Sequence, residues 1–215
     1  TVLFPGGPLP LRSFETRYID LVRRCMRAGM RCGVVLIREG VEAGGAATTF
    51  DVGTYARIVD FSQQPDGLLG ISAQGERRFR ILERRRARDG LNLADVEWLP
   101  NEQSQPLPQD FAELGPAIDA ILAQVGEPYA SLERHLGDAA WVSARLTEVL
   151  PVPAQHKQHC LELDAPVERL RYLRPMFEIG YQLRQPRGAA PGRRSTAFLT
   201  GKVRCVRLAA WFPGR

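Results

Sequence analysis

Three potential metal ligands lie close together in the segment HKQHC, which covers residues 156–160. On a helix His156, His159 and Cys160 would share one face, and imidazole and thiolate groups are ligands that zinc prefers. A structural zinc site takes four ligands, however, and the sequence offers no second cluster to complete the set. None of the four cysteines belongs to a CxxC pair. We therefore expect no bound metal and no cofactor, and interpret the cysteines as reduced thiols of a cytoplasmic protein.

The sequence also lacks the patterns of common catalytic sites. A phosphate-binding loop requires GxxxxGK[ST], and the nearest segment, GAAPGRRST at 188–196, has a different glycine spacing and arginine in place of lysine. A Ser–Lys dyad requires a lysine packed beside a serine, but the only lysines are Lys157 and Lys202, and neither lies in a matching motif. The three histidines lie in polar segments without a recognisable nucleophile turn. We therefore predict that the chain is not an enzyme.

The formal net charge of +5 is concentrated at the C-terminal end. No acidic residue follows Glu178, and residues 184–215 carry eight arginines and lysines, whereas residues 1–183 carry 21 basic and 24 acidic residues. Because phosphate contacts supply much of the affinity for nucleic acids, we expect RNA binding to be unfavourable except through the basic tail. The one dense basic run, RRFRILERRRAR at 77–88, would divide its charges between the two faces of a strand.

Hydrophobic periodicity predicts which elements would position any site. A helix is expected at 13–28, with Ser13 as its N-cap, and strands are expected at 32–39, 52–61, 68–75, 77–85 and 91–99. The strands at 68–75 and 77–85 are separated by a glycine, which suggests a hairpin. Further helices are expected at 111–125, 131–136, 138–150, 154–163 and 165–183. No run of 18 apolar residues occurs, so we expect no membrane span.

These elements predict an α+β chain with two structural parts. A small β-barrel with an inserted helix is expected at 1–100 and a C-terminal helical bundle at 110–184, joined by a proline-rich linker at 101–109. Residues 185–215 are rich in Gly, Pro and Arg, and are expected to form a disordered tail. The apolar segment VRLAAWFPG within that tail has no evident partner. The absence of an initiating Met suggests that a few native residues precede Thr1, and the first residues do not have the pattern of a secretion signal.

Three separate motifs resemble the N-terminal, substrate-binding domain of Lon proteases. They are LFPGGPLPLRSFETRYIDLV, GTYARIVDF with the following GISAQGERRFRI, and LTEVLPVPAQHKQHCLELDAPVERL, and they occur in the family's order over residues 1–178. The resemblance implies a PUA-like barrel followed by a helical bundle. It also implies a stand-alone member of the family, because the sequence contains neither an ATPase motif nor a protease motif.

The opening segment LFPGGPLPLRSFETRY allows two interpretations. Its prolines lack backbone donors and suit an edge segment, while its leucines and Phe14 could close the barrel. Alternatively, Phe4, Leu11, Phe14 and Tyr18 line an exposed apolar groove that binds peptide.

The resemblance implies a non-catalytic module that recognises unfolded or exposed apolar segments of other proteins. Such a module could act as an adaptor or regulator of proteolysis, with a protease as a second partner. RNA binding by the PUA-like barrel and small-molecule binding in the barrel remain alternative interpretations. We expect no membrane partner and a cytoplasmic location.

Overall fold

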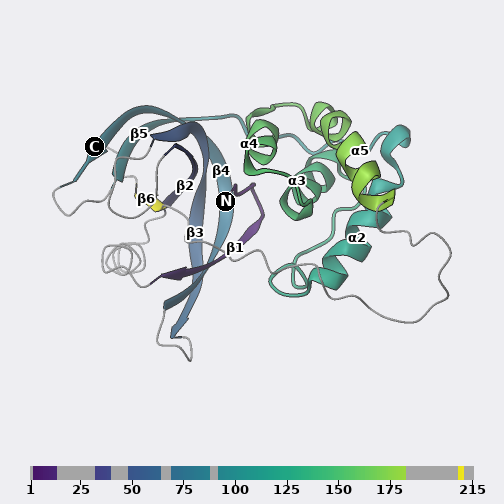
Figure 1. The fold of residues 1–215 in the computed structure, drawn as a ribbon, viewed down its shortest axis with the longest axis horizontal. Coiled ribbons are helices and arrows are strands. Elements are labelled where there is room, and N and C mark those ends of the chain that lie inside the picture. Colours follow the sequence, from purple (N-terminus) through teal and green to yellow (C-terminus); the bar gives the residue numbers. More distant parts are fainter. Residues whose placement is uncertain are drawn as a thin grey trace. The chain divides into compact units, whose positions relative to one another are not determined.

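The computed structural model divides the chain into two compact units (Figure 1). Unit 1 comprises Thr1–Asn101 and Val203–Arg215, and unit 2 comprises Glu102–Lys202. Within them the structure describes residues 2–13, 32–39, 48–63, 69–87, 92–182 and 208–210. Residues 102–109, which the sequence suggested as a linker, belong to unit 2. The predicted mixture of helix and sheet is confirmed, and no helix in the described ranges is long and apolar enough to cross a bilayer.

Unit 1 is built on a sheet whose neighbouring strands run mostly antiparallel. Its strands are β1 (Pro8–Ser13), β2 (Cys32–Glu39), β3 (Thr48–Gln63), β4 (Leu69–Arg86), β5 (Asn92–Trp98) and β6 (Leu208–Ala210). They lie in the order β1-β4-β3-β2-β6-β5, and β4 also pairs with β5. The long strands β3 and β4 curve through the unit (Figure 1). The first half of β4 pairs with β1 and its second half with β5, so β4 organises the sheet.

The predicted closed barrel requires a correction. A barrel needs a continuous ladder between its first and last strands. Among the described residues β2 and β5 do not pair with each other, and only the three-residue β6 lies between them, with a single residue pair to β5. The sheet of unit 1 is therefore a curved antiparallel sheet that its long strands do not close.

The hairpin predicted within 68–85 was also wrong. The segments 68–75 and 77–85 form one strand, β4, because Gly75 lies within a ladder beside a bulge at Glu76 and not in a turn. Ser13, the predicted N-cap, is the last residue of β1, and the rest of the helix predicted at 13–28 lies outside the described residues, so that helix stays a prediction. The edge position predicted for the prolines is confirmed, since β1 is the terminal strand of the sheet and contains Pro8 and Pro10.

The N-terminal turn packs directly against the backbone of β4. Gly7 N donates to Phe4 O at 3.0 Å, and Gly6 adopts a φ of 71°, a conformation that favours glycine. Gly75 accepts a hydrogen bond from Gly6 N at 2.8 Å and donates to Gly7 O at 2.9 Å. A Cβ atom at Gly75 would lie 2.2 Å from Phe4 O. Only glycine therefore allows this approach of the two backbones.

Buried apolar side chains stabilise each face of the sheet. One cluster gathers residues of β1 to β4 beneath the N-terminal turn, namely Leu3, Leu9, Leu11, Cys32, Val34, Ala56, Ile58, Ile71 and Ala73. A second cluster contains Val35, Phe79, Ile81 and Ala94. On β1 the buried residues alternate with exposed ones, as Leu9 and Leu11 do around the exposed Pro10, whereas on β2 all residues from Cys32 to Leu36 are buried.

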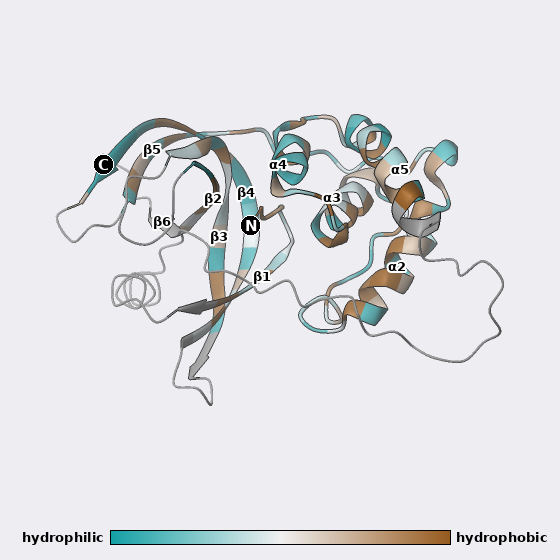
Figure 2. Cartoon of the chain, in the orientation of Figure 1, coloured by the Kyte–Doolittle hydropathy of each residue, from teal (hydrophilic) through white to brown (hydrophobic). Residues whose placement is uncertain are grey.

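In its described residues, 102–182, unit 2 contains one short 3-10 helix and four α-helices. They are η1 (Gln109–Phe111), α2 (Leu114–Val125), α3 (Ala139–Val149), α4 (Ala154–Glu162) and α5 (Pro166–Gln182). Apolar residues recur along α2 and α3 (Figure 2), and those that are buried, such as Leu114, Ile118 and Leu122, follow helical spacing. The short helix predicted at 131–136 is absent. There the Arg134 guanidinium donates to the backbone oxygens of Tyr129 and Leu132, which replaces the hydrogen bonds of a helical turn.

A fully buried arginine joins the helices of unit 2. Arg169 Nε donates to Cys160 O at 2.8 Å, and Nη1 donates to Ser143 Oγ at 3.1 Å and to Glu102 Oε2 at 3.0 Å. Nη2 donates to Leu163 O at 3.1 Å and also to Glu102 Oε1. All five guanidinium N–H groups are thereby used, which meets the condition for burying a charge. The network connects α5 with α3, with the end of α4 and with the segment that leads into unit 2.

We predict that Gly75→Ala destabilises unit 1. The added methyl group would displace the N-terminal turn from β4, and overpacking of this kind costs about 1–3 kcal/mol. Thermal unfolding followed by circular dichroism should show a lower midpoint. Gly137→Ala is the matched control, because a Cβ atom there meets nothing within 4 Å. Equal midpoints for both variants would contradict the close approach.

We predict that Arg169→Met destabilises unit 2 by about 3–5 kcal/mol, because it leaves the Glu102 carboxylate without its buried partner. The double variant Arg169→Met/Glu102→Leu should recover much of that loss, since both charges are then removed together. The free energy of unfolding is measured by urea titration of the helical signal. Arg85→Met removes an exposed ion pair with Asp95 and should change stability by less than about 1 kcal/mol. If Arg169→Met also lowered the free energy of unfolding by less than about 1 kcal/mol, the role of the network would be contradicted.

Candidate functional site

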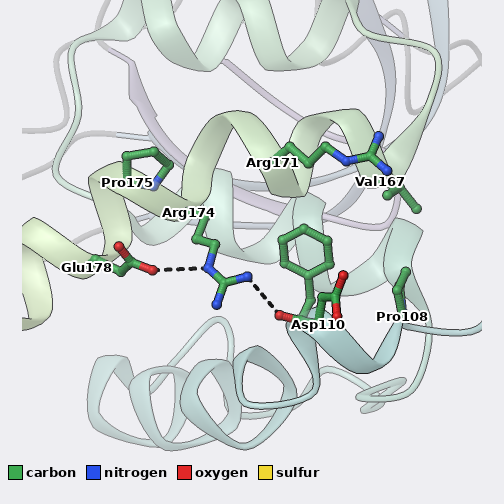
Figure 3. Close-up of a pocket in the computed structure, with 8 residues that line it drawn as sticks. Pro108, Asp110, Val167, Arg171, Arg174, Pro175 and Glu178 are labelled. Atoms are coloured by element: carbon green, nitrogen blue, oxygen red, sulfur yellow. Dashed lines mark hydrogen bonds and ion pairs between the residues drawn. The ribbon is translucent and has the colours of Figure 1, made fainter.

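A groove on unit 2 lies between η1 and one face of α5 (Figure 3). It has a volume of about 500 Å³. Its lining comes from two short segments of chain: Pro108, Asp110 and Phe111 on the side of η1, and Val167, Arg171, Arg174, Pro175 and Glu178 on the side of α5. The groove is therefore a feature of the helical unit alone.

Helical spacing explains why α5 presents this wall. Residues 167, 171, 174, 175 and 178 follow one another at intervals that place their side chains along one stripe of a helix. Leu170, Leu173 and Phe177 are buried, and they occupy positions between the groove residues. One side of α5 is thus anchored in the core of unit 2 while the other is available at the surface.

Arg174 joins the two walls of the groove. Its Nη1 donates to Asp110 O at 2.9 Å and its Nε donates to Glu178 Oε1 at 3.0 Å (Figure 3). Nη2 lies 3.4 Å from Glu113 Oε1, and the guanidinium carbon lies 5.5 Å from the centroid of the Phe111 ring. These contacts hold η1 against α5. The carboxylates of Glu178 and Glu113 also neutralise the charge of Arg174 within the protein.

Arg171 differs from Arg174, because its guanidinium has no hydrogen-bond or ion-pair partner within the described part of the chain. It is exposed and lies in the groove beside Val167 (Figure 3). One helical turn further on, Pro175 lacks an N–H group and cannot donate to the carbonyl of Arg171. The groove therefore combines apolar surface from Phe111, Val167 and the prolines with an unneutralised cation.

This arrangement is suited to binding. The lining contains no Cys, Ser, Thr, Lys or His side chain that could act as a nucleophile or as an imidazole base. An apolar side chain of a ligand could lie on the apolar surface while a carboxylate pairs with Arg171. The groove can accordingly recognise a group that is partly apolar and partly acidic.

The predicted peptide-binding residues lie elsewhere, in unit 1. Phe4 is fully buried and Leu11 is 5% exposed, so in this structure neither side chain lines an open groove. Leu11 packs in the cluster that contains Leu3 and Leu9. Phe14 and Tyr18 lie outside the described residues, and their part in peptide binding stays a prediction. The sequence patterns did not predict the groove on unit 2. The proline at position 175, inside a helix, was the signal that could have pointed to it.

The candidate metal ligands do not converge. His156 Nδ1 lies 2.6 Å from Tyr172 Oη, and the ring of His159 lies 4.6 Å from the ring of Tyr172. Cys160 is buried instead, and burial raises the pKa of its thiol by more than Thr147 and Arg169 lower it. A protonated thiol is a poor ligand and a poor nucleophile. In the residues that the structure describes, no three His, Cys, Asp or Glu side chains are grouped so as to hold a metal ion.

Lys157, one of the two lysines considered as catalytic bases, supports the end of a helix. Its Nζ donates to Glu148 O at 2.7 Å, in the last turn of α3. Burial lowers the pKa of its ammonium group, and the charge of Glu148 offsets part of this effect. A cation at the C-terminus of a helix is favourable for the helix dipole. Lys157 thus has a structural contact that accounts for its position.

Part of the basic run on β4 is engaged by neighbouring segments. Arg84 forms an ion pair with Asp51, and Arg85 with Asp95 at 2.6 Å. Arg78 is buried, and Arg77 donates from Nε to Leu99 O at 3.2 Å. Strand pairing therefore places carboxylates beside Arg84 and Arg85, which reduces the positive charge available to a phosphate backbone.

Residues 1–177 match the family model described as the ATP-dependent protease La (LON) substrate-binding domain. The Lon protease of Haemophilus influenzae is 28% identical over 189 residues, which cover 82% of this chain and 23% of that protein. The Lon protease of Anaeromyxobacter dehalogenans is 30% identical over 176 residues, which cover 75% of this chain and 20% of that protein. The chain thus spans about a fifth of the length of these curated relatives.

Solved structures agree with the sequence relatives. A Lon N-terminal domain protein from Xanthomonas campestris superposes with a TM-score of 0.67 at 35% sequence identity, over 81% of this chain and 92% of that one. The N-terminal domain of Mycobacterium avium complex Lon protease superposes with a TM-score of 0.55 at 16% identity, over 83% of this chain and 93% of that one, and shows the fold alone. Since the family model covers most of the 215 residues, the chain belongs to the family of Lon substrate-binding domains.

Proposed function

We propose that the chain is a non-catalytic recognition module that binds unfolded polypeptides, or exposed apolar segments of folded ones. The observation that carries the proposal is the match of residues 1–177 to a domain family described by substrate binding. In a Lon protease, the substrates of such a domain are proteins. The module would act as an adaptor or regulator that presents these polypeptides to a protease.

We further propose that a client polypeptide docks in the groove between η1 and α5. The occupant is an extended segment that carries an apolar side chain and a nearby carboxylate. The apolar side chain would pack on Val167 and the prolines, and the carboxylate would pair with Arg171, whose charge is not neutralised within the described residues. Arg174 keeps the walls of the groove in place, and most of its capacity for hydrogen bonds is already used.

The groove favours this function over the alternatives from the sequence. A polypeptide supplies apolar side chains and carboxylates together, whereas RNA would bring phosphates to a surface that also carries the carboxylates of Asp110 and Glu178. On β4, Arg84 and Arg85 are engaged by Asp51 and Asp95. A small molecule could also enter the groove, but the lining contains no Cys, Ser, Thr, Lys or His side chain that could act on it.

The proposal predicts that Val167→Asp/Arg171→Gln weakens binding of an unfolded polypeptide by about tenfold or more, which corresponds to about 1.4 kcal/mol. The double variant places a carboxylate on the apolar surface and removes the free cation. An acidic residue in the first turn of α5 is compatible with the helix dipole, so the fold should be retained. The measurement is fluorescence anisotropy with labelled β-casein, which is an unfolded, apolar and acidic polypeptide.

The matched control is Arg80→Gln, which removes an exposed arginine from unit 1 and should leave the affinity unchanged. Circular dichroism checks that each variant folds. If the wild-type chain binds no β-casein at concentrations on the order of 100 μM, the recognition function is wrong. If it binds and the double variant binds equally well, the function stands but the groove is not the site.

A further inference from the structure

The sheet of unit 1 contains a gap that is one strand wide. β2 pairs on one side with β3, and β5 pairs with β4. Between β2 and β5 lies β6, which comes from the C-terminal end of the chain (Figure 1). Ala210 is paired with Cys32 of β2 and also with Leu93 of β5. A single extended segment therefore fills the distance between the two strands, and we call this position the strand slot.

The walls of the strand slot are apolar and uncharged where β6 pairs. On β2 the paired residues are Cys32, Gly33 and Val34, all of them buried. Leu93 of β5 packs against the cluster that also contains Cys32 and Val34. Backbone N–H and C=O groups at such a position require hydrogen-bond partners, because buried and unpaired polar groups are costly. The slot is thus a place that needs an extended occupant.

The present occupant explains an otherwise unassigned part of the sequence. The segment VRLAAWFPG contains β6 at Leu208–Ala210, which follows unit 2 in the chain but pairs within unit 1. Its pairing with β2 is antiparallel, with Leu208 opposite Val34, Ala209 opposite Gly33 and Ala210 opposite Cys32. The three paired residues, Leu208, Ala209 and Ala210, are apolar and uncharged, and the main-chain ladder holds them in the slot.

The free edge at the other end of the sheet differs in its chemistry. β1 is the terminal strand, and its Pro8 and Pro10 lack N–H groups. Because the two prolines are two residues apart, both missing donors lie on the same side of β1, the side away from β4. Addition of another strand to β1 is therefore disfavoured. The outer edge of β1 and the strand slot thus differ, and the strand slot is the position suited to an added strand.

We propose that the strand slot accepts an extended, uncharged apolar segment of a client polypeptide by strand addition, and that Leu208–Ala210 occupies the slot as an internal competitor until a client displaces it. Main-chain hydrogen bonds would supply affinity without a strict sequence requirement, as in other cases of β-augmentation. The inference rests on the proposed recognition function and adds a second contact region, on unit 1, which selects apolar segments rather than acidic ones.

The test uses the full chain with Ala210→Pro, which removes the N–H group of the residue that lies between β2 and β5. Hydrogen exchange of those amides of 32–34 that point towards β6 should become about tenfold faster than in the wild type, because the slot is vacated. The affinity for labelled β-casein should rise several-fold, since the competent state is more populated. A synthetic peptide with the sequence VRLAAWFPG should restore slow exchange. Ala189→Pro, a proline elsewhere in the tail, is the control and should change neither quantity.

The outcomes separate this inference from the proposed function. Unchanged exchange at 32–34 would overturn the inference whatever the chain binds, because β6 would then not protect the slot. Faster exchange with an unchanged affinity for β-casein would also overturn it, since clients would then bind elsewhere. A failure of both chains to bind β-casein at all would instead overturn the recognition function on which the inference rests.

Discussion

The buried guanidinium of Arg169 is the interaction on which the helical unit depends. Burying a charge is favourable only when every donor is satisfied, and Arg169 meets this requirement by reaching four residues in three parts of unit 2. Its bonds to Cys160 O and Leu163 O fix the end of α4 at the start of α5. Its contact with Ser143 adds α3, and its ion pair with Glu102 fixes the segment that enters the unit.

The position of the groove follows from this anchor. Arg169 is in the first turns of α5, so the helix that carries Val167, Arg171 and Arg174 is fixed in rotation as well as in position. The opposite wall, η1, is held by Arg174 through Asp110 O. A preformed groove reduces the entropy lost when a flexible polypeptide binds, because only the client has to become ordered. The proposed groove on unit 2 would select a client by its side chains, an apolar one and a carboxylate. The proposed strand slot on unit 1 would instead require an extended, uncharged segment that pairs through its main chain.

Sequence patterns predicted the elements better than they predicted the site. Helices at 138–150 and 154–163 correspond closely to α3 and α4, because apolar spacing and flanking prolines mark their ends. The role of Arg169 could not be predicted, since a buried arginine looks like any other charged residue of an amphipathic helix. Phe4 and Leu11 were considered as groove residues, but apolar residues favour burial and surface recognition alike. β6 could not be predicted either, because its pairing joins residues far apart in the sequence and is only three residues long.

The central claim is that the groove between η1 and α5 is where unit 2 meets a client polypeptide. Nuclear magnetic resonance of the isotope-labelled chain during titration with β-casein tests it most directly. We expect the amide signals of Asp110, Val167, Arg171 and Glu178 to shift together and to saturate with the binding curve. Saturable binding that shifts other signals of unit 2 and leaves these four unchanged would contradict the claim.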